Sequence, residues 1–193
     1  MKVLVIGGVA AGTKAAAKLK RLDRSADVRI LTMSKDISYA GCGLPYYVGD
    51  LIHDRSELVV NTPEKYAALT GAQVETEVEV TKLNREVKTV TAVDHKTGEE
   101  RTYDYDKLII ATGASPIVPP VEGIHLKNIF VMRTPDDAAA IREAVDAGEI
   151  KRAVVAGAGF IGLEVAENLH ARGVRTTAID MARKIMPPFD PEV

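Results

Sequence analysis

A glycine-rich hexapeptide between a buried strand and a helix constrains this chain more than any other feature. The sequence Gly157-Ala158-Gly159-Phe160-Ile161-Gly162 follows the apolar run 153–156 and precedes a helical pattern that continues to about Arg172. In such a turn the first glycine allows a tight bend, the second lets the backbone approach a pyrophosphate, and the third lets the helix pack on the strand. The helix N-terminus offers free N–H groups and a partial positive charge to the phosphates. The segment therefore predicts a dinucleotide site made by Gly157, Gly159, Phe160, Ile161 and Gly162.

An acidic residue ends the strand expected at 174–180. Asp180 stands 18 residues beyond Gly162, where a carboxylate accepts hydrogen bonds from ribose hydroxyls and repels a 2′-phosphate. This position favours NADH over NADPH. Arg175 and Arg183 keep NADPH open, because a nearby arginine can bind the additional phosphate.

A second, less regular turn lies 150 residues earlier, counted from Gly157 back to Gly7. The buried strand 3–6 runs into Gly7-Gly8-Val9-Ala10-Ala11-Gly12, and an Ala-rich helix at 10–22 and a strand at 28–31 follow. Val9 occupies the place of the middle glycine, and Thr32 that of the ribose-binding acid. Two such turns predict two dinucleotides, and a natural pair is a flavin and a nicotinamide.

The remaining pattern predicts an α/β fold with two Rossmann-like dinucleotide-binding units and an antiparallel β insertion. Short helices are expected at 42–48 and after the N-cap Thr62, antiparallel strands between 73 and 92, a buried strand at 108–111 and a helix at 135–147. Three prolines between 115 and 123 indicate a linker. We expect a first dinucleotide-binding domain at 1–115, a linker at 116–125 and the start of a second one at 126–193. Because the second sheet has barely begun at Asp180, we expect the chain to be truncated.

Composition narrows the functional class. The chain has 25 Lys and Arg against 27 Asp and Glu, a formal net charge of −2, which gives no electrostatic reason to bind nucleic acid or an anionic membrane. Its one cysteine excludes an internal disulfide and a cysteine zinc cluster, so no metal is expected. No apolar run approaches the ~20 residues of a membrane span. We expect a cytoplasmic protein.

The lone thiol lies in an open stretch of sequence. Cys42 is flanked by Gly41 and Gly43, so its sulfur is sterically accessible. If Cys42 begins the short helix, the helix dipole favours its thiolate, the nucleophilic form. A buried, inert cysteine is the equally weighted alternative.

Several motifs, taken in chain order, resemble the flavoprotein pyridine nucleotide-disulfide oxidoreductases. They are Gly7–Gly12, Ser38–Tyr47, Ala111–Ala114, Gly157–Gly162 and Ile185–Asp190, the last including Pro187 and Pro188. Because position 47 is Tyr rather than a second Cys, the chain is most similar to the single-cysteine branch, which contains coenzyme A-disulfide reductases, NADH oxidases and NADH peroxidases. The most specific part of the resemblance is the segment around Cys42.

The resemblance implies that the domain at 1–115 is an FAD-binding domain and that 126–193 begins an NAD(P)H-binding domain, and it implies a role for each motif. Cys42 is implied to be the redox-active residue beside the flavin, Phe160 an aromatic gate over the flavin, and Glu164 an acid near the nicotinamide. The implied FAD contacts are Gly7, Gly8, Val9, Ala10, Ala11, Gly12, Thr32, Met33, Ser34, Val80, Ala111, Thr112 and Gly113.

Two further features bear on the branch. Oxidases and peroxidases of this group carry a histidine where this chain has Ala10, which favours a disulfide substrate. Lys14, Lys18 and Arg21 share one face of the first helix. Taken alone, such a stripe is most often a solvated surface, but in coenzyme A-disulfide reductases this face, with Ser38, lines the coenzyme A channel. Gly41 replaces the asparagine usual before the cysteine, which weakens that one contact.

The expected activity is electron transfer from NADH through FAD to Cys42 and on to a coenzyme A disulfide, a polysulfide or a similar small disulfide. Two alternatives stay open, an NADH oxidase or peroxidase and a non-catalytic, redox-sensing flavin module or inactive fragment. The family implies a homodimer formed by a C-terminal domain. We therefore expect these 193 residues alone to bind FAD weakly and to turn over little.

Overall fold

Two compact units make up the computed structural model, which describes residues 1–186, 189 and 190. The first contains Met1–Tyr39 and Val59–Ala114, and the second contains Ala40–Leu58 and Ser115–Val193. The sequence analysis assigned residues 40–58 to the first domain, whereas in the structure they pack with the second unit. The assignment of the domains to FAD and NAD(P)H stays a prediction.

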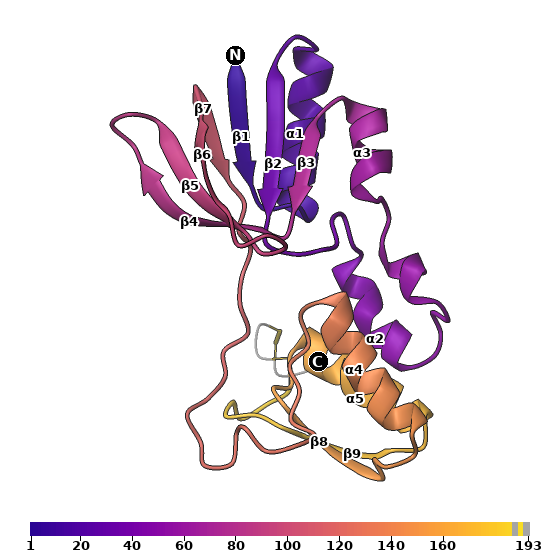
Figure 1. The fold of residues 1–193 in the computed structure, drawn as a ribbon. Helices are drawn as coiled ribbons and strands as arrows, with labels where there is room; N and C mark the ends of the chain where they lie inside the picture. The colour runs from indigo at the N-terminus through magenta and orange to yellow at the C-terminus, as the bar shows by residue number, and fades with distance from the viewer. Residues whose placement is uncertain (187–188, 191–193) are drawn as a thin grey trace. The chain divides into compact units, whose positions relative to one another are not determined.

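A four-stranded parallel sheet forms the centre of the first unit (Figure 1). Its strands are β1 (Lys2–Ile6), β2 (Asp27–Thr32), β3 (Gln73–Thr76) and β7 (Lys107–Ile110), in the order β3-β2-β1-β7. The prediction of antiparallel strands from residue 73 onward was wrong for β3, which pairs in parallel with β2. Alternation of apolar and polar residues shows that one face of a strand is covered, but it does not identify the neighbouring strand.

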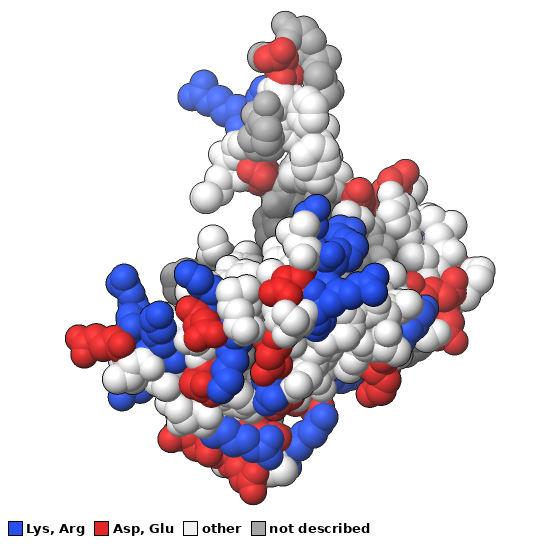
Figure 2. Space-filling view, turned by 90° about the horizontal axis from the view of Figure 1, so that it is seen from above, with Lys and Arg blue, Asp and Glu red and all other residues white. Residues whose placement is uncertain are grey.

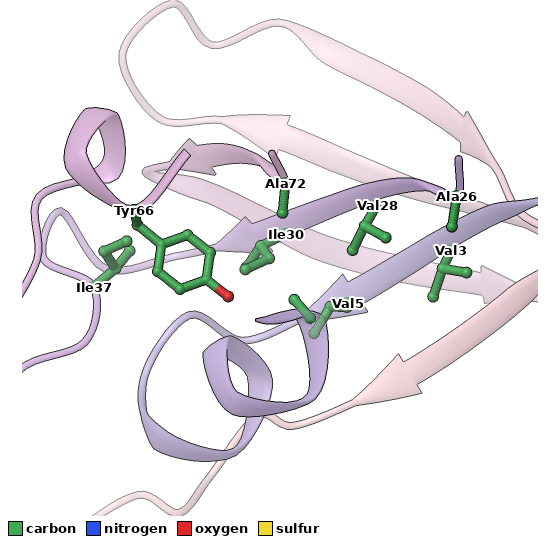
Figure 3. Close-up of a cluster of buried hydrophobic side chains, with 9 residues drawn as sticks. Val3, Val5, Ala26, Val28, Ile30, Ile37, Tyr66 and Ala72 are labelled. Atoms are coloured by element: carbon green, nitrogen blue, oxygen red, sulfur yellow. The ribbon is translucent and has the colours of Figure 1, made fainter. Parts of the chain in front are cut away.

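Helices α1 (Ala10–Leu22) and α3 (Pro63–Thr70) cover one face of this sheet. Figure 3 shows the core beneath them, where alternate residues of β1 and β2 point to the face of the sheet on which Tyr66 of α3 lies. Val5 and Ile30 in this core are fully buried, and burial of each such side chain contributes about 1.5–3 kcal/mol to the stability of the fold. The Tyr66 hydroxyl donates to the carbonyl of Thr13 and so ties α3 to α1.

An antiparallel three-stranded sheet packs on the opposite face. It consists of β4 (Val78–Asn84), β5 (Thr89–Asp94) and β6 (Glu100–Asp104). Leu4 and Leu31 of the parallel sheet meet Val78, Val90 and Ala92 of this insertion. The antiparallel strands were expected to end at residue 92, so β6 was missed. Its sequence, Glu-Arg-Thr-Tyr-Asp, contains one aromatic residue and no aliphatic one, and therefore shows no apolar pattern.

The second unit contains a two-stranded parallel sheet of β8 (Arg152–Ala156) and β9 (Arg175–Ile179) with α5 (Phe160–Ala171) between them. Helix α4 (Pro135–Asp146) begins with a capping box in which Thr134 and Asp137 exchange hydrogen bonds with each other's backbone N–H. The segment 40–58 adds two 3₁₀ turns, Gly41–Gly43 and Arg55–Leu58, and the short helix α2 (Leu44–Val48). Leu44, Val48 and Leu58 share one apolar core with α4 and α5.

Positive and negative side chains are interspersed over the face seen in Figure 2. Surface ion pairs such as Lys2–Asp104 and Arg29–Glu75 belong to the first unit. Across residues 1–186, 189 and 190, no helix combines the length and the apolar character that crossing a membrane requires.

Candidate functional site

The glycine turn of the second unit has the geometry predicted for a phosphate-binding turn. Gly157 adopts a φ of +112°, and its N–H donates to the carbonyl of Ile179 at 2.8 Å. A Cβ on Gly162 would lie 1.9 Å from the Gly157 carbonyl oxygen, so only glycine allows this approach of α5 to β8. A Cβ on Gly159 would meet nothing within 4 Å, which leaves the middle position open to a ligand.

Asp180, which directly follows β9, is hydrogen-bonded to this turn. Its carboxylate accepts hydrogen bonds from the backbone N–H groups of Ala158 and Ala182, both at 2.7 Å. These N–H donors hold the pKa of Asp180 below its usual value. Each carboxylate oxygen has a second lone pair, so the group can still accept hydrogen bonds from a ribose.

The other predicted nicotinamide contacts lie at the start of α5. Phe160 and Ile161 are exposed, and Glu164 is half-buried. The ring of Phe160 meets the ring of Phe189 edge-on, with centroids 5.6 Å apart and planes at 71°. Pro187 and Pro188 of the tail motif lie outside the described residues.

The first unit contains the same kind of turn at the carboxyl ends of β1, β2 and β7. Gly7 has a φ of +110°, and a Cβ there would lie 2.1 Å from the carbonyl oxygen of Ala111. A Cβ on Gly12 would lie 1.8 Å from the Gly7 carbonyl oxygen. The carbonyl of Gly8 accepts from the N–H of Ser38 at 2.9 Å. The structure thus brings Gly7–Gly12, Ala111 and Ser38 together.

The remaining residues predicted near this turn differ in exposure. Thr32 is buried, with its methyl group against Gly8, and Ser34 accepts a hydrogen bond from the N–H of Asp36. Val80 is half-buried on β4 beside an irregularity in its pairing with β5. The exposed ones are Met33, Thr112, Gly113 and, along one face of α1, Lys14, Lys18 and Arg21.

The starts of α1 and α5 differ from those of α3 and α4 in a way that fits bound phosphates. Helices α3 and α4 have threonine N-caps and acidic residues in their first turns. Helices α1 and α5 start from Val9 and Gly159 with no side-chain cap and no acid in the first turn. Their first N–H groups therefore have no side-chain acceptor, and an anion placed there would satisfy them. Both turns fit the pyrophosphate of a dinucleotide.

Cys42 is exposed and lies in the 3₁₀ turn Gly41–Gly43. The alternative of a buried cysteine is therefore wrong, and the reactivity of Cys42 stays a prediction. A Cβ on Gly41 would meet nothing within 4 Å, whereas one on Gly43 would lie 3.1 Å from both Ile52 and Leu58. The residue before Cys42 thus lies in open space, and the residue after it packs within the second unit.

Sequence reasoning missed the residues that hold the segment after Cys42. Arg142 of α4 donates to the carbonyls of Tyr47 and Ile52, and Arg172 donates to that of Val48. The side chain of Asn168 on α5 fills the space over Gly49. These contacts join residues about a hundred positions apart, and no local pattern marks them. Among the described residues, no group of three or more His, Cys, Asp or Glu side chains is placed to hold a metal ion.

Comparison with known proteins identifies the family. Residues 1–193 match the family of pyridine nucleotide-disulphide oxidoreductases. The chain belongs to this family. Its resemblance to the oxidoreductases, deduced from the motifs, is thereby confirmed, as is the α/β fold with Rossmann-like units.

Three relatives show the range of activities within this oxidoreductase family. A curated coenzyme A disulfide reductase from Staphylococcus haemolyticus is 36% identical over all of this chain and 43% of its own length. A solved NAD-dependent persulfide reductase from A. fulgidus is 40% identical, with a TM-score of 0.92 over 97% of this chain and 35% of its own. A water-forming NADH oxidase from Lactobacillus brevis, bound to NADH, is 35% identical, with a TM-score of 0.90 over 97% of this chain and 41% of its own. The chain thus spans less than half the length of each of these oxidoreductases.

The two glycines beside Cys42 offer a matched pair of substitutions. Gly43→Ala is expected to destabilise the second unit by about 1–3 kcal/mol, because the added methyl group presses on Ile52 and Leu58. Gly41→Ala fills open space and is expected to change stability by less than about 0.5 kcal/mol. Urea unfolding of both variants measures this difference, and equal destabilisation would contradict the packing described for Gly43.

Proposed function

We propose that the whole protein transfers electrons from NADH through FAD to Cys42 and on to a coenzyme A disulfide, a polysulfide or a similar small disulfide. The observation that carries this proposal is the exposure of the chain's one thiol beside the open position of Gly41. Family membership and two turns suited to dinucleotide phosphates support it.

Each turn is proposed to hold one nucleotide. NADH docks with its pyrophosphate at the start of α5, and Asp180 accepts hydrogen bonds from its ribose. FAD is held at Gly7–Gly12, with Thr32–Ser34, Val80 and Ala111–Gly113 as its further contacts. Glu164 and Phe160 face the nicotinamide.

Cys42 is proposed to act as the nucleophile. Its thiolate attacks one sulfur of the substrate R–S–S–R, forming a Cys42–S–S–R mixed disulfide and releasing R–S⁻, which takes a proton. Bound FAD supplies the two-electron chemistry that connects hydride from NADH to this disulfide. The electron pair breaks the S–S bond, returning the Cys42 thiolate and a second R–S⁻. One NADH and one proton thus convert R–S–S–R into two R–SH.

The covalent chain supports a thiol close to the flavin. Tyr39 is the last residue of its stretch in the first unit, and only Ala40 and Gly41 separate it from Cys42. Three peptide units span at most ~11 Å, so the backbone of Cys42 lies within that reach of Tyr39.

Coenzyme A is the proposed thiol partner. Lys14, Lys18 and Arg21 are exposed on one face of α1, and their charges suit its phosphates. Ser38 lies at the same end of the first unit as the Gly7–Gly12 turn, through its bond to Gly8. The curated relative named a coenzyme A disulfide reductase supports this choice.

Oxygen reduction is the second candidate, because the water-forming NADH oxidase is 35% identical to this chain. Against it, Ala10 places a methyl group where the resemblance implies that oxidases carry a histidine, so the proton donor expected there is missing. A dimer and a cytoplasmic location stay predictions of the sequence.

The test compares NADH consumption by the FAD-loaded whole protein with coenzyme A disulfide, with polysulfide and with oxygen alone. The proposal expects NADH consumption to require a disulfide or polysulfide and to release thiols, two per NADH with coenzyme A disulfide. Oxygen uptake that exceeds thiol release would favour the oxidase. Absence of turnover with every acceptor would favour a non-catalytic module.

The nucleotide preference is tested by Asp180→Asn. The amide removes the negative charge that repels a 2′-phosphate, so the ratio of kcat/KM for NADH over NADPH is expected to fall about tenfold or more. Glu167→Gln removes an equal charge from an exposed position on α5 and should leave the ratio unchanged. An unaltered ratio in Asp180→Asn would contradict the role of this carboxylate.

A further inference from the structure

A half-buried arginine of α4, Arg142, binds the segment that follows Cys42. Nη1 of Arg142 donates to the carbonyl oxygen of Tyr47 at 3.0 Å and to that of Ile52 at 2.8 Å. Nη2 pairs with the carboxylate of Asp50, and Nε lies 3.5 Å from that of Asp146. The guanidinium carbon also lies 4.5 Å from the centre of the Tyr47 ring. With its side chain 15% exposed, Arg142 is enclosed by the groups it binds.

The Tyr47 carbonyl belongs to the last turn of α2, where it also accepts from the Asp50 N–H at 3.2 Å, and the Ile52 carbonyl lies beyond the helix. Helix α2 ends at Val48, and the last carbonyls of a helix have no partner within it. The planar guanidinium presents several N–H donors in fixed directions, so one arginine can bind two carbonyls and a carboxylate together. Arg172, the C-cap residue of α5, adds a bond to the Val48 carbonyl at 3.2 Å and pairs with Asp146 as well.

A short path of contacts leads from Arg142 to the thiol. Arg142 holds the backbone of Ile52, and the Cδ1 atom of Ile52 lies beneath Gly43, 3.1 Å from where a Cβ would stand. Gly43 directly follows Cys42 and is fixed by its own N–H bond to the Ala40 carbonyl at 2.9 Å. A shift of Ile52 therefore changes the support of the turn that carries the thiol.

We propose that Arg142 is a positioning residue for Cys42, acting by holding residues 47–52 so that Ile52 supports the Gly41–Gly43 turn. The part of this inference that concerns catalysis rests on the proposed function. In that reaction the sulfur must meet both the flavin and the substrate disulfide, and a displacement of about 1 Å can cost roughly a hundredfold in rate.

The test uses Arg142→Met and Arg142→Lys, with Arg55→Met as the matched control. Arg55 also joins the segment to α4, in this case through a 2.7 Å ion pair with the side chain of Asp136. Arg142→Lys keeps the positive charge beside Asp50 and Asp146 but lacks the planar set of donors. It therefore still tests the proposal if Arg142→Met fails to fold.

The first readout is amide hydrogen exchange, which needs neither NADH nor FAD. Arg142→Met is expected to speed exchange at Gly43 and at residues 49–52 about tenfold or more, with Arg142→Lys between it and the wild type. Arg55→Met should stay within about twofold of the wild type. Unchanged exchange at Gly43 in both Arg142 variants would overturn the proposal.

The second readout separates the two half-reactions of the whole protein. Flavin reduction by NADH is expected to stay within about twofold in the Arg142 variants, whereas disulfide reduction through Cys42 falls about tenfold or more. An equal loss in both half-reactions would overturn the specific role. If the wild type itself reduces no disulfide, the proposed function fails, while the exchange result still decides whether Arg142 positions the thiol turn.

Discussion

Replacing Cys42 by serine is expected to lower disulfide reduction by about a thousandfold or more, because a hydroxyl is a far weaker nucleophile than a thiolate at neutral pH. Within these 193 residues no second cysteine can take over the exchange with substrate. Reduction of the bound flavin by NADH should persist, since it does not involve sulfur. Stopped-flow absorbance resolves the flavin step, and thiol release measures the disulfide step.

Stability serves as the control for Cys42→Ser. The side chain is exposed, so this near-isosteric change should alter the free energy of unfolding by less than about 0.5 kcal/mol. Disulfide turnover retained by a folded variant would show that electrons reach the substrate without Cys42. Loss of flavin reduction together with disulfide reduction would contradict the separation of the two steps.

The second large effect is expected at Gly7. In Gly7→Ala the new methyl group would lie 2.1 Å from the carbonyl oxygen of Ala111, a backbone atom that cannot rotate away. Ala111 is itself bound to β1 through its N–H to the Ile6 carbonyl at 2.8 Å. The substitution must therefore separate β7 from β1 at the proposed FAD turn. We expect a loss of at least about 3 kcal/mol in the first unit and loss of FAD binding.

Gly157→Ala is the matched control, since Gly157 has a φ of +112° against +110° for Gly7. A Cβ on Gly157 would meet nothing within 4 Å, so only the backbone strain of about 1–2 kcal/mol remains. Amide exchange at β1 and β7 in the first variant, and at β8 and β9 in the second, measures each unit separately. An equal loss of stability in the two variants would show that backbone strain, rather than collision with Ala111, causes the effect of Gly7→Ala.

The acid stability of the NADH turn follows from Asp180. Its folded-state pKa lies below the unfolded value of about 3.9, so its bonds to Ala158 and Ala182 stabilise the turn fully above that value. This stabilisation is lost as the pH falls through the lower folded-state pKa. In Asp180→Asn, the unfolding of the second unit should depend less on pH below about 4.

Local pattern was enough to predict the parts of the fold that depend on local physics. The apolar run 3–6, the glycine turns and the Ala-rich stretch from Ala10 correspond to β1, the two turns and α1. Thr62 caps α3 as predicted, with its hydroxyl oxygen accepting from the N–H of Lys65. These features report backbone conformation and burial over a few neighbouring residues, which sequence encodes directly.

Features that depend on distant partners were missed. Nothing in Gln73–Thr76 shows that its neighbour is β2, and nothing in Ala40–Leu58 shows that its apolar residues pack on α4 and α5. Arg142 looks like an ordinary helix-surface residue in sequence, and its role becomes visible only when the carbonyls of Tyr47 and Ile52 are placed beside it. The exposure of Cys42 likewise needed the structure, because flanking glycines are compatible with either environment.

The most direct test of the account is an oxygen-free NADH titration of the flavin-loaded whole protein, prepared with Cys42 as a mixed disulfide with coenzyme A. Flavin absorbance and free thiols are recorded together. The account predicts that the first equivalent of NADH releases coenzyme A and the Cys42 thiol while the yellow colour persists, and that the second bleaches it. Bleaching by the first equivalent without release of either thiol would contradict the claim that electrons from NADH pass to Cys42.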